Sequence, residues 1–420
     1  SDPVVQSERS ANIPWGGGES ALELPETRPG AYQVDMKVVD TATDRILSGT
    51  CLRYSVGAPG IDLDLGELPA GDDWGGAAPL RGVELAARLG IDSHRVQLSF
   101  GSLIPSPTST PDASAIQWWA LPRADGDDDD PFVDLRRASE FAGATGVRLI
   151  IQVADGGDAE RAAIEAGTWA GWVSLIVAGI IEEAPTISTW EPLNEPNNAF
   201  DDSAEYWRTV EIPFADAVHA IQPDAVVIGG NTLGFANDWW ETAETSGLCS
   251  HIDAVGVHPY TGWNRSWEEE GFDRDGEGYD ALRESIGPSC AELPVWDTET
   301  GWTADSATAY WAQGSNVARK LLWNELEDVA GWTYFFSEGG WGENDLSWSL
   351  VQYRSHVKPG GLAFATATRL LEGRGTPEVV ESSIPFTRIM SVPGDDTMRV
   401  AWTDEARIPA VLTTDSASIT

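Results

Sequence analysis

Two hydrophobic patterns alternate along the chain from about residue 79 to about residue 370. One is helical: apolar residues recur every three or four positions, as in "LRGVELAARLG", where Gly90 is expected to end the helix. The other is a short apolar run rich in β-branched and aromatic residues. These strand-like runs are, in order, "RVQLSF", "VRLIIQVA", "TISTWEPLNEP", "AVVIGGN", "IDAVGVHPY", "LPVWDTETGW" and "GWTYFFSE". A helical segment precedes each run, and residues 158–184 are expected to form one long helix.

This alternation predicts an α/β fold in which all strands of the main sheet are parallel. The apolar runs indicate strands that are buried on both faces, as in a parallel sheet covered by helices. Seven strands are visible, and we expect an eighth, the first in chain order, near residues 57–68. The count favours a closed (β/α)8 TIM barrel over residues 59–372. No G-x-G-x-x-G follows the first strands, which removes the main reason to expect a dinucleotide-binding sheet.

Both ends of the chain differ from this central region. Residues 1–30 are rich in Gly, Pro and Ser without periodicity and are expected to form a flexible arm. Residues 31–58 and 373–420 alternate apolar and polar positions in short runs separated by turn residues, which predicts antiparallel strands. We expect these two segments to pair into a small accessory β-sandwich beside the barrel.

The charge of the chain restricts its partners and its surroundings. There are 67 acidic and 26 basic residues, which give a formal net charge of −41, and only three of the basic residues are lysines. Such a charge opposes compaction unless salt screens it, so a high-salt environment is expected. It also argues against nucleic acid as a partner, because phosphates would be repelled. The longest apolar stretch, Trp172 to Ile181, is too short to cross a bilayer, so no membrane insertion is expected.

Three cysteines, Cys51, Cys249 and Cys290, fit no metal-binding spacing. Cys249 and Cys290 flank strands expected to be neighbours, so a disulfide between them is one interpretation, in an extracellular or cell-surface protein. Three buried thiols are the other interpretation. The five histidines contain no H-x-x-x-H pair, so no catalytic zinc is expected.

Two glutamates stand at the ends of predicted strands. Glu195 lies in "WEPLNEPN" after the fourth strand of the barrel, and Glu299 lies in "WDTETGW" at the end of the seventh. Side chains at the carboxyl ends of barrel strands project over one shared mouth. Two carboxylates across a small gap are the minimum apparatus for cleaving a glycosidic bond, since one protonates the leaving oxygen and the other attacks the anomeric carbon or activates water.

Other interpretations of these acidic residues remain open. An isolated Asn-Glu-Pro is also typical of a strand-to-loop turn with a solvated glutamate. Asp297 has the same strand parity as Glu299 and is the second choice for its role. Glu191 is expected to be a structural hydrogen-bonding residue inside the barrel.

The sequence resembles a known group of enzymes in four places. "NEPN", the "HPY" after an apolar strand, "TETGW" and the helix-to-strand entry "LGIDSHRVQL" resemble retaining glycoside hydrolases of clan A, most closely family 39, the β-xylosidase-like and iduronidase-like group. The resemblance covers roughly residues 80–370 and implies a (β/α)8 barrel with an adjacent β-sandwich. It implies Glu195 as general acid/base and Glu299 as nucleophile.

The resemblance also implies the residues that surround the sugar. Asn194 would donate to the sugar 2-hydroxyl and Arg95 would support the nucleophile. His258 and Tyr260 would line the same subsite, and Trp332 would stack under the sugar. Loop tryptophans, among them Trp302, Trp341 and Trp348, are also candidates for stacking, although about half of the loop set is expected to be structural.

These observations predict a retaining glycoside hydrolase that acts on an oligo- or polysaccharide by double displacement and requires no cofactor. Two alternatives remain: a catalytically silent carbohydrate-binding or cell-surface barrel, and a transglycosylase. The sequence leaves the sugar, the linkage and the oligomeric state open.

Overall fold

The computed structural model describes residues 30–40, 45–56, 79–123, 130–154, 156–262, 265–274, 276–304, 307–335, 348–352, 356–382 and 387–403. Two predicted segments therefore lie outside the described residues: the arm at 1–30, apart from Gly30, and the first barrel strand near residues 57–68. Among the residues that are described, no helix is both long and apolar enough to cross a membrane.

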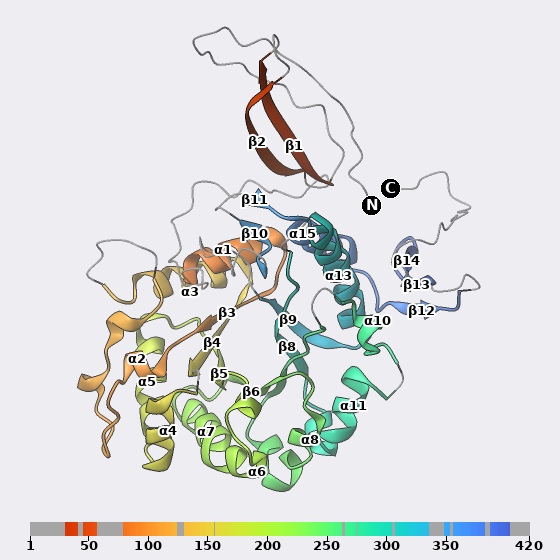
Figure 1. Cartoon of the computed structure of the whole chain (residues 1–420). Coiled ribbons are helices and arrows are strands. Elements are labelled where there is room, and N and C mark those ends of the chain that lie inside the picture. Colours follow the sequence, from red (N-terminus) through yellow and green to blue (C-terminus); the bar gives the residue numbers. More distant parts are fainter. Residues whose placement is uncertain are drawn as a thin grey trace.

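Seven parallel strands form the main sheet, in the order in which they occur along the chain. Figure 1 shows them arranged around a centre with helices outside. The strands are β3 (Ser93–Gln97), β4 (Arg148–Ala154), β5 (Thr189–Leu193), β6 (Val226–Leu233), β7 (Ala254–His258), β8 (Val295–Thr300) and β9 (Val329–Tyr334). The first and last of these meet at one point, where the Ser93 hydroxyl lies 2.9 Å from that of Thr333. The sheet is thus nearly closed into a barrel, as predicted.

Helices connect the strands and cover the outside of the sheet. The helices longer than four residues are α1 (Pro79–Leu89), α3 (Val133–Thr145), α4 (Asp158–Glu165), α5 (Trp169–Glu183), α7 (Ile212–Ile221), α11 (Gly278–Ser285), α13 (Ala307–Leu326) and α15 (Pro359–Leu371). Short helices are α2 (Phe100–Leu103), α6 (Ser203–Tyr206), α8 (Asn237–Trp240), α9 (Ala243–Ser246), α10 (Trp267–Glu270) and α12 (Pro288–Ala291). A π-helical turn, η4 (Trp207–Glu211), joins α6 to α7, and single 3₁₀ turns are η1 (Ala113–Ala115), η2 (Trp118–Ala120), η3 (Pro196–Asn198) and η5 (Leu248–Ser250).

Glycines end or interrupt helices where a left-handed backbone is needed. Gly90 follows α1 with φ 72°, as the sequence predicts. The single helix expected over residues 158–184 is instead two, α4 and α5, and Gly167 lies between them with φ 66°. A residue without a Cβ adopts this conformation without steric cost, so the chain turns there instead of continuing the helix.

The core has two parts. A large apolar cluster fills the space between the sheet and the helices. A small separate cluster, Ile150, Ile228, Ala254 and Trp296, comes from four different strands and fills the inside of the barrel. Strands β5, β7 and β8 are buried along their whole length, which is why they read as nearly continuous apolar runs.

The β-rich ends form separate sheets. β1 (Gly30–Asp40) and β2 (Arg45–Val56) make an antiparallel hairpin, and β12 (Glu378–Val380), β13 (Thr387–Val392) and β14 (Met398–Thr403) make a three-stranded antiparallel sheet. A further pair is β10 (Val351–Gln352) with β11 (His356–Val357). The hairpin and the three-stranded sheet are not hydrogen-bonded to each other in the described residues (Figure 1), so the strands of the two ends do not pair as expected.

The three-stranded sheet is attached to the barrel by polar contacts. Trp402 Nε1 on β14 donates to Glu268 Oε1 on α10 at 2.9 Å, and Arg388 on β13 forms an ion pair of 2.6 Å with Asp273. Both acidic partners belong to the segment that follows β7. The hairpin expected to pair with this sheet lies near α15 and β11 instead.

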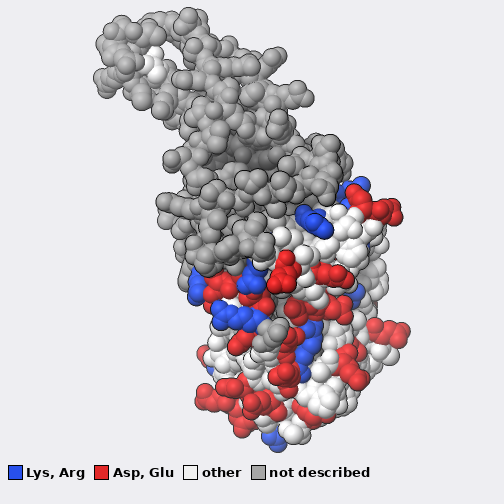
Figure 2. Space-filling model, turned by 90° about the vertical axis from the view of Figure 1, so that its right-hand side faces the viewer, with Lys and Arg blue, Asp and Glu red and all other residues white. Residues whose placement is uncertain are grey.

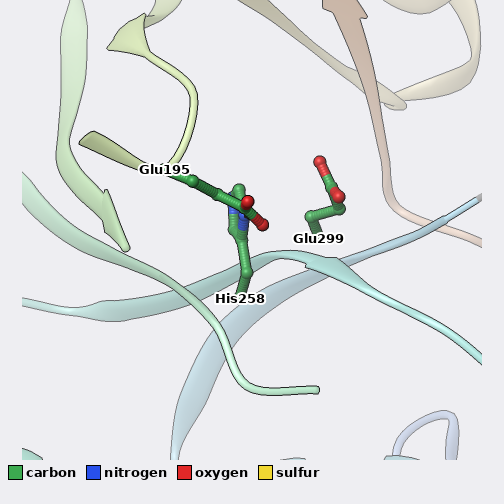
Figure 3. Close-up of side chains that lie close together, drawn as sticks. All are labelled: Glu195, His258 and Glu299. Carbon is green, nitrogen blue, oxygen red and sulfur yellow. The ribbon is translucent and has the colours of Figure 1, made fainter. Parts of the chain in front are cut away.

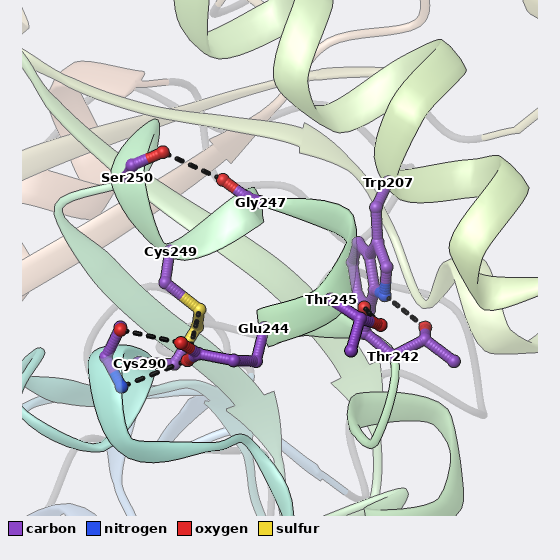
Figure 4. Close-up of a disulfide and its surroundings, with 9 residues drawn as sticks. Trp207, Thr242, Glu244, Thr245, Gly247, Cys249, Ser250 and Cys290 are labelled. Carbon is purple, nitrogen blue, oxygen red and sulfur yellow. Dashed lines mark hydrogen bonds between the residues drawn. A yellow bond between two sulfur atoms is a disulfide. The ribbon is translucent and has the colours of Figure 1, made fainter.

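Cys249 and Cys290 form a disulfide. Figure 4 shows it beside Glu244, whose carboxylate accepts hydrogen bonds from the backbone and the hydroxyl of Ser289 at 3.0 and 2.7 Å. The bond joins η5, just before β7, to α12, just before β8. The first of the two interpretations of these cysteines is therefore confirmed.

Candidate active site

The carboxyl groups of Glu195 and Glu299 meet at the carboxyl ends of β5 and β8. One oxygen of each lies, together with a ring nitrogen of His258, in a group whose members are all within 4.8 Å of one another. Figure 3 shows both glutamates extending toward a common space, with His258 next to Glu195. The two residues, 104 positions apart in the sequence, therefore share one mouth of the barrel, as the strand order predicts.

Glu299 is held by two strong donors. Arg95 NH1 donates to Glu299 Oε2 at 2.6 Å, and the Tyr260 hydroxyl donates to Glu299 Oε1 at 2.9 Å. The Glu299 residue is 9% exposed. Hydrogen bonds from a guanidinium and a phenol fix the orientation of this carboxylate.

Arg95 is the centre of a buried network beneath the mouth. Besides Glu299, its Nε donates to Glu191 Oε2 at 2.5 Å and its NH2 to Asn194 Oδ1 at 2.9 Å. Burial opposes the charge of Arg95, but Glu191 and Glu299 outweigh this and raise its pKa. Glu191 is completely buried, in agreement with the structural role expected for it.

Glu195 has different neighbours. Its Oε1 lies 3.1 Å from His258 Nδ1, and its Oε2 accepts from Asn198 Nδ2 at 3.1 Å. Burial raises the pKa of Glu195, opposed by the more distant Arg95 and by Asn198. Burial also lowers the pKa of His258 to about 3, so its imidazole is neutral and supplies no positive charge to Glu195.

The backbone at Glu195 is unusual, with φ 44° and ψ 56° in the left-handed region. Its N–H donates to the carbonyl of Asn231 on β6 at 3.0 Å, and Asn231 itself has φ 48°. Non-glycine residues rarely adopt this conformation, and it persists where surrounding contacts fix it. Pro196 then begins η3, which brings Asn198 back toward the Glu195 carboxylate.

Asp297 does not share the position of Glu299. It is completely buried, and its carboxylate lies 3.0 Å from Lys320 Nζ on α13, in the helix layer. The second choice for the role of Glu299 is therefore excluded by geometry, since Asp297 does not reach the mouth.

Two predicted stacking residues are packing residues. Trp332 is 3% exposed and lies against Phe364 of α15, with ring centroids 5.1 Å apart. Trp302 is 2% exposed, and its Nε1 donates to Thr261 Oγ1 at 2.8 Å. The expectation that these rings stack on a sugar is wrong, because both are buried between the strands and their surroundings. Trp341 lies outside the described residues.

Two other aromatic residues lie next to Tyr260, the hydroxyl donor to Glu299. Phe335 and Trp348 are half-buried, and each packs edge-on against the Tyr260 ring, with centroids 6.3 and 5.7 Å apart. Phe335 directly follows β9. In the sequence, both residues are marked only by their position after a strand, and Trp348 shares this position with the other loop tryptophans.

A hollow of about 560 Å³ lies on the rim next to this site. It is lined by residues of the segments after β5 and β6, namely Asp201, Ser203, Ala236, Asn237, Asp238 and Trp239. Asn197 joins the two segments, because its side chain donates to the carbonyl and accepts from the N–H of Leu233 at 3.1 and 2.9 Å. Neither Glu195 nor Glu299 lines this hollow.

Comparison with known proteins identifies the fold. No family model matches the sequence, and no curated protein sequence matches it. A family 39 glycoside hydrolase from the gut symbiont Bacteroides cellulosilyticus superposes with a TM-score of 0.63 at 16% identity, over 90% of this chain and 79% of that one. A glucosidase from Croceicoccus marinus superposes with a TM-score of 0.53 at 11% identity, over 76% of each chain. The chain thus has a TIM-barrel fold, which these glycoside hydrolases share, and its structural similarity to the family 39 enzyme extends over 90% of the chain.

Proposed function

We propose that this protein is a retaining glycoside hydrolase that cleaves an oligo- or polysaccharide by double displacement. The observation that carries the proposal is the approach of the Glu195 and Glu299 carboxyl oxygens to within 4.8 Å. In retaining enzymes the two carboxyl groups are about 5–5.5 Å apart, whereas inverting enzymes leave about 6.5–9.5 Å for a water molecule.

The environments of the two carboxyl groups assign their roles. Glu299 acts as nucleophile, because hydrogen bonds from Arg95 and Tyr260 fix its orientation at the mouth. Glu195 acts as general acid, since its raised pKa favours the protonated form that must transfer a proton to the leaving oxygen. After the glycosyl-enzyme ester has formed and the leaving group has departed, the Glu195 carboxylate removes a proton from water, which attacks the anomeric carbon and releases Glu299.

The remaining site residues position the sugar. Asn194 Oδ1 is occupied by Arg95, which leaves its amide N–H groups available to donate to a sugar hydroxyl. Phe335 and Trp348 offer partly exposed rings next to Tyr260, the hydroxyl donor to the nucleophile, and an apolar sugar face can stack on such rings. No step in this mechanism needs a cofactor.

Stereochemistry tests this function. The protein is first screened against aryl glycosides and polysaccharides, and the anomeric configuration of the first-formed product is then followed by NMR. Net retention supports double displacement, and net inversion overturns it. Binding without hydrolysis over the whole panel favours a carbohydrate-binding barrel, and transfer to sugar acceptors in place of water favours a transglycosylase.

We also propose that the protein works outside the cell in concentrated salt. The disulfide is typical of oxidising compartments. Acidic side chains outnumber basic ones on the face shown in Figure 2, and the side chains of Lys320 and Lys358 are completely buried. The midpoint of thermal unfolding is expected to rise when KCl is raised from about 0.1 M to about 2 M, because screening reduces self-repulsion. A midpoint that stays constant or falls would contradict the proposal.

A further inference from the structure

The end of β8 does not follow the alternation of a regular strand. Trp296 packs inside the barrel, and Asp297 points to the helix layer, where it meets Lys320. Regular alternation would turn Glu299 the same way as Asp297. Glu299 instead contacts Arg95, whose strand neighbour Ile150 packs inside the barrel.

A β-bulge accounts for this reversal. Asp297 lies opposite Trp332 of β9, and Thr300 lies opposite Tyr334. From Asp297 to Thr300 the chain of β8 advances by three residues, whereas from Trp332 to Tyr334 the chain of β9 advances by two. β8 therefore contains one extra residue between Asp297 and Thr300. An inserted residue changes the face to which the following side chains point, and bulges next to active sites often redirect a side chain in this way.

The side chain of Asp297 stabilises the bulge. Its Oδ1 accepts a hydrogen bond from the Thr300 hydroxyl. Burial raises the pKa of Asp297, opposed by Lys320, by Thr300 and by the backbone N–H of Glu299. Aspartate side chains that bind groups two or three residues further along the chain compete with the strand ladder and fix a turn. Glu299 lies between Asp297 and Thr300 in the sequence, within the bulge.

Lys320 of α13 fixes Asp297 from the other side. Its ammonium lies 3.0 Å from Asp297 Oδ2 and donates to the Tyr279 hydroxyl at 2.8 Å and to Asn324 Oδ1 at 2.7 Å. It also lies 3.9 Å from the centre of the Trp267 ring. Both members of the ion pair are completely buried.

The choice of lysine at this position is informative, because the chain uses arginine for all but three of its 26 basic residues. An ammonium is a compact charge with three donors, whereas a guanidinium is a planar fork that needs more space. The three oxygen acceptors around Lys320 match an ammonium.

We propose that the Lys320–Asp297 ion pair is a positioning device that maintains the β8 bulge and thereby turns Glu299 toward the mouth. The proposal rests on the function assigned to Glu299 above. Lys320, Asp297 and Thr300 touch no substrate and act only through the position of the nucleophile.

Thr300→Val tests the device with the least disturbance, because valine has nearly the shape of threonine but donates no hydrogen bond to Asp297. We expect kcat to fall about tenfold with KM changed less than about threefold, since a displaced nucleophile impairs reaction more than binding. Thr300→Ser, which restores the hydroxyl, is expected to recover most of kcat. Lys320→Met is expected to lower kcat by about 10²-fold, and Lys320→Arg is expected not to rescue it.

Arg319→Met is the matched control. Arg319 is the neighbouring residue on α13 and forms its own ion pair of 3.3 Å with the buried Glu268, away from β8. This variant is expected to lose stability while kcat stays near the wild-type value. If folded Thr300→Val and Lys320→Met keep wild-type kcat, or if Arg319→Met loses kcat as much as they do, the device is refuted.

A crystal structure of Thr300→Val separates this proposal from the proposed function. The contact of 2.6 Å between Arg95 and Glu299 is expected to lengthen or break in the variant, whether or not the wild-type protein hydrolyses any glycoside. An unchanged Glu299 in that structure overturns the positioning device even if Thr300→Val folds poorly in solution. Absence of hydrolysis by the wild-type protein overturns only the proposed function.

Discussion

The ends of β5 and β8 present the same side chain in two different settings. At the end of β5, Glu195 lies beside a neutral imidazole and an amide and keeps a raised pKa. At the end of β8, Glu299 accepts from a guanidinium and a phenol. In the proposed mechanism one residue type supplies both a proton donor and a nucleophile, and the charged and polar neighbours of the two glutamates divide the roles.

Removal of the β8 carboxylate should have the largest effect. Glu299→Ala is expected to lower kcat on the order of 10⁵-fold, because no covalent intermediate forms without the nucleophile. Added azide should restore turnover and give a product of inverted configuration, which is measured by NMR. Wild-type activity in this variant would show that the two glutamates have been assigned wrongly.

Loss of the β5 carboxyl group should be less severe and should depend on the leaving group. Glu195→Gln is expected to lower kcat by about 10²–10⁴-fold for substrates with a poor leaving group, because general acid catalysis contributes that much. For an aryl glycoside with an acidic phenol, formation of the ester needs little protonation, so the loss in that step should be much smaller. Equal losses for both kinds of substrate would contradict the role of Glu195 as acid.

Arg95 contacts both Glu299 and Asn194, the residue before Glu195, so its removal should affect both ends of the site. Arg95→Met leaves Glu191 and Glu299 without their shared cation, and such loss of one partner from a buried network costs about 3–5 kcal/mol in free energy of unfolding. Without this donor, Glu299 loses the contact of 2.6 Å that fixes its orientation, so kcat on an aryl glycoside at neutral pH is expected to fall about 10²-fold. An unchanged kcat would show that Arg95 does not position the nucleophile.

Glu211, away from the mouth, shows what burial does without a compensating cation. It is completely buried in η4, and burial raises its pKa to about 8, opposed by the Tyr206 hydroxyl and the Gly230 N–H. Because this folded-state pKa exceeds the unfolded value, its contribution to stability is fully present below about pH 4.5 and is lost as pH rises through 8.

Glu211→Gln should therefore weaken the fall in stability between about pH 5 and pH 8, by up to a few kcal/mol at the alkaline end. Urea unfolding of both proteins at a series of pH values measures this difference, and kcat at neutral pH serves as the control. Parallel stability curves for the two proteins would refute the assignment to Glu211.

The sequence predicts the parts of this comparison that depend on strand order. Parallel strands place their carboxyl ends at one edge, so the convergence of Glu195 and Glu299 follows from counting βα units. The support of Glu299 by Arg95 is implied by the resemblance to family 39 and does not follow from strand order, which places only the end of β3 at the same mouth. The adjacency of β7 and β8 makes a disulfide between Cys249 and Cys290 one of two interpretations of the sequence, and the structure shows which of them holds.

The parts that the sequence does not predict depend on local departures from regular structure. Alternation gives Asp297 and Glu299 the same face, and only the bulge separates them. Trp332 lies opposite Asp297 and shares its direction toward the helices, so a ring expected beneath the sugar packs on α15 instead. The hydrophobic pattern of a single sequence does not reveal an inserted residue. The bulge depends on contacts of the Asp297 side chain with Thr300 and Lys320, and these contacts leave no periodic signal.

Covalent trapping tests the central claim most directly. The protein is incubated with an activated 2-deoxy-2-fluoro glycoside of the sugar found by screening, digested, and analysed by mass spectrometry. The account predicts one equivalent of sugar attached to the peptide that contains Glu299, and no attachment in Glu299→Ala. A label on Glu195, or an active enzyme that never accumulates a labelled peptide, would contradict it.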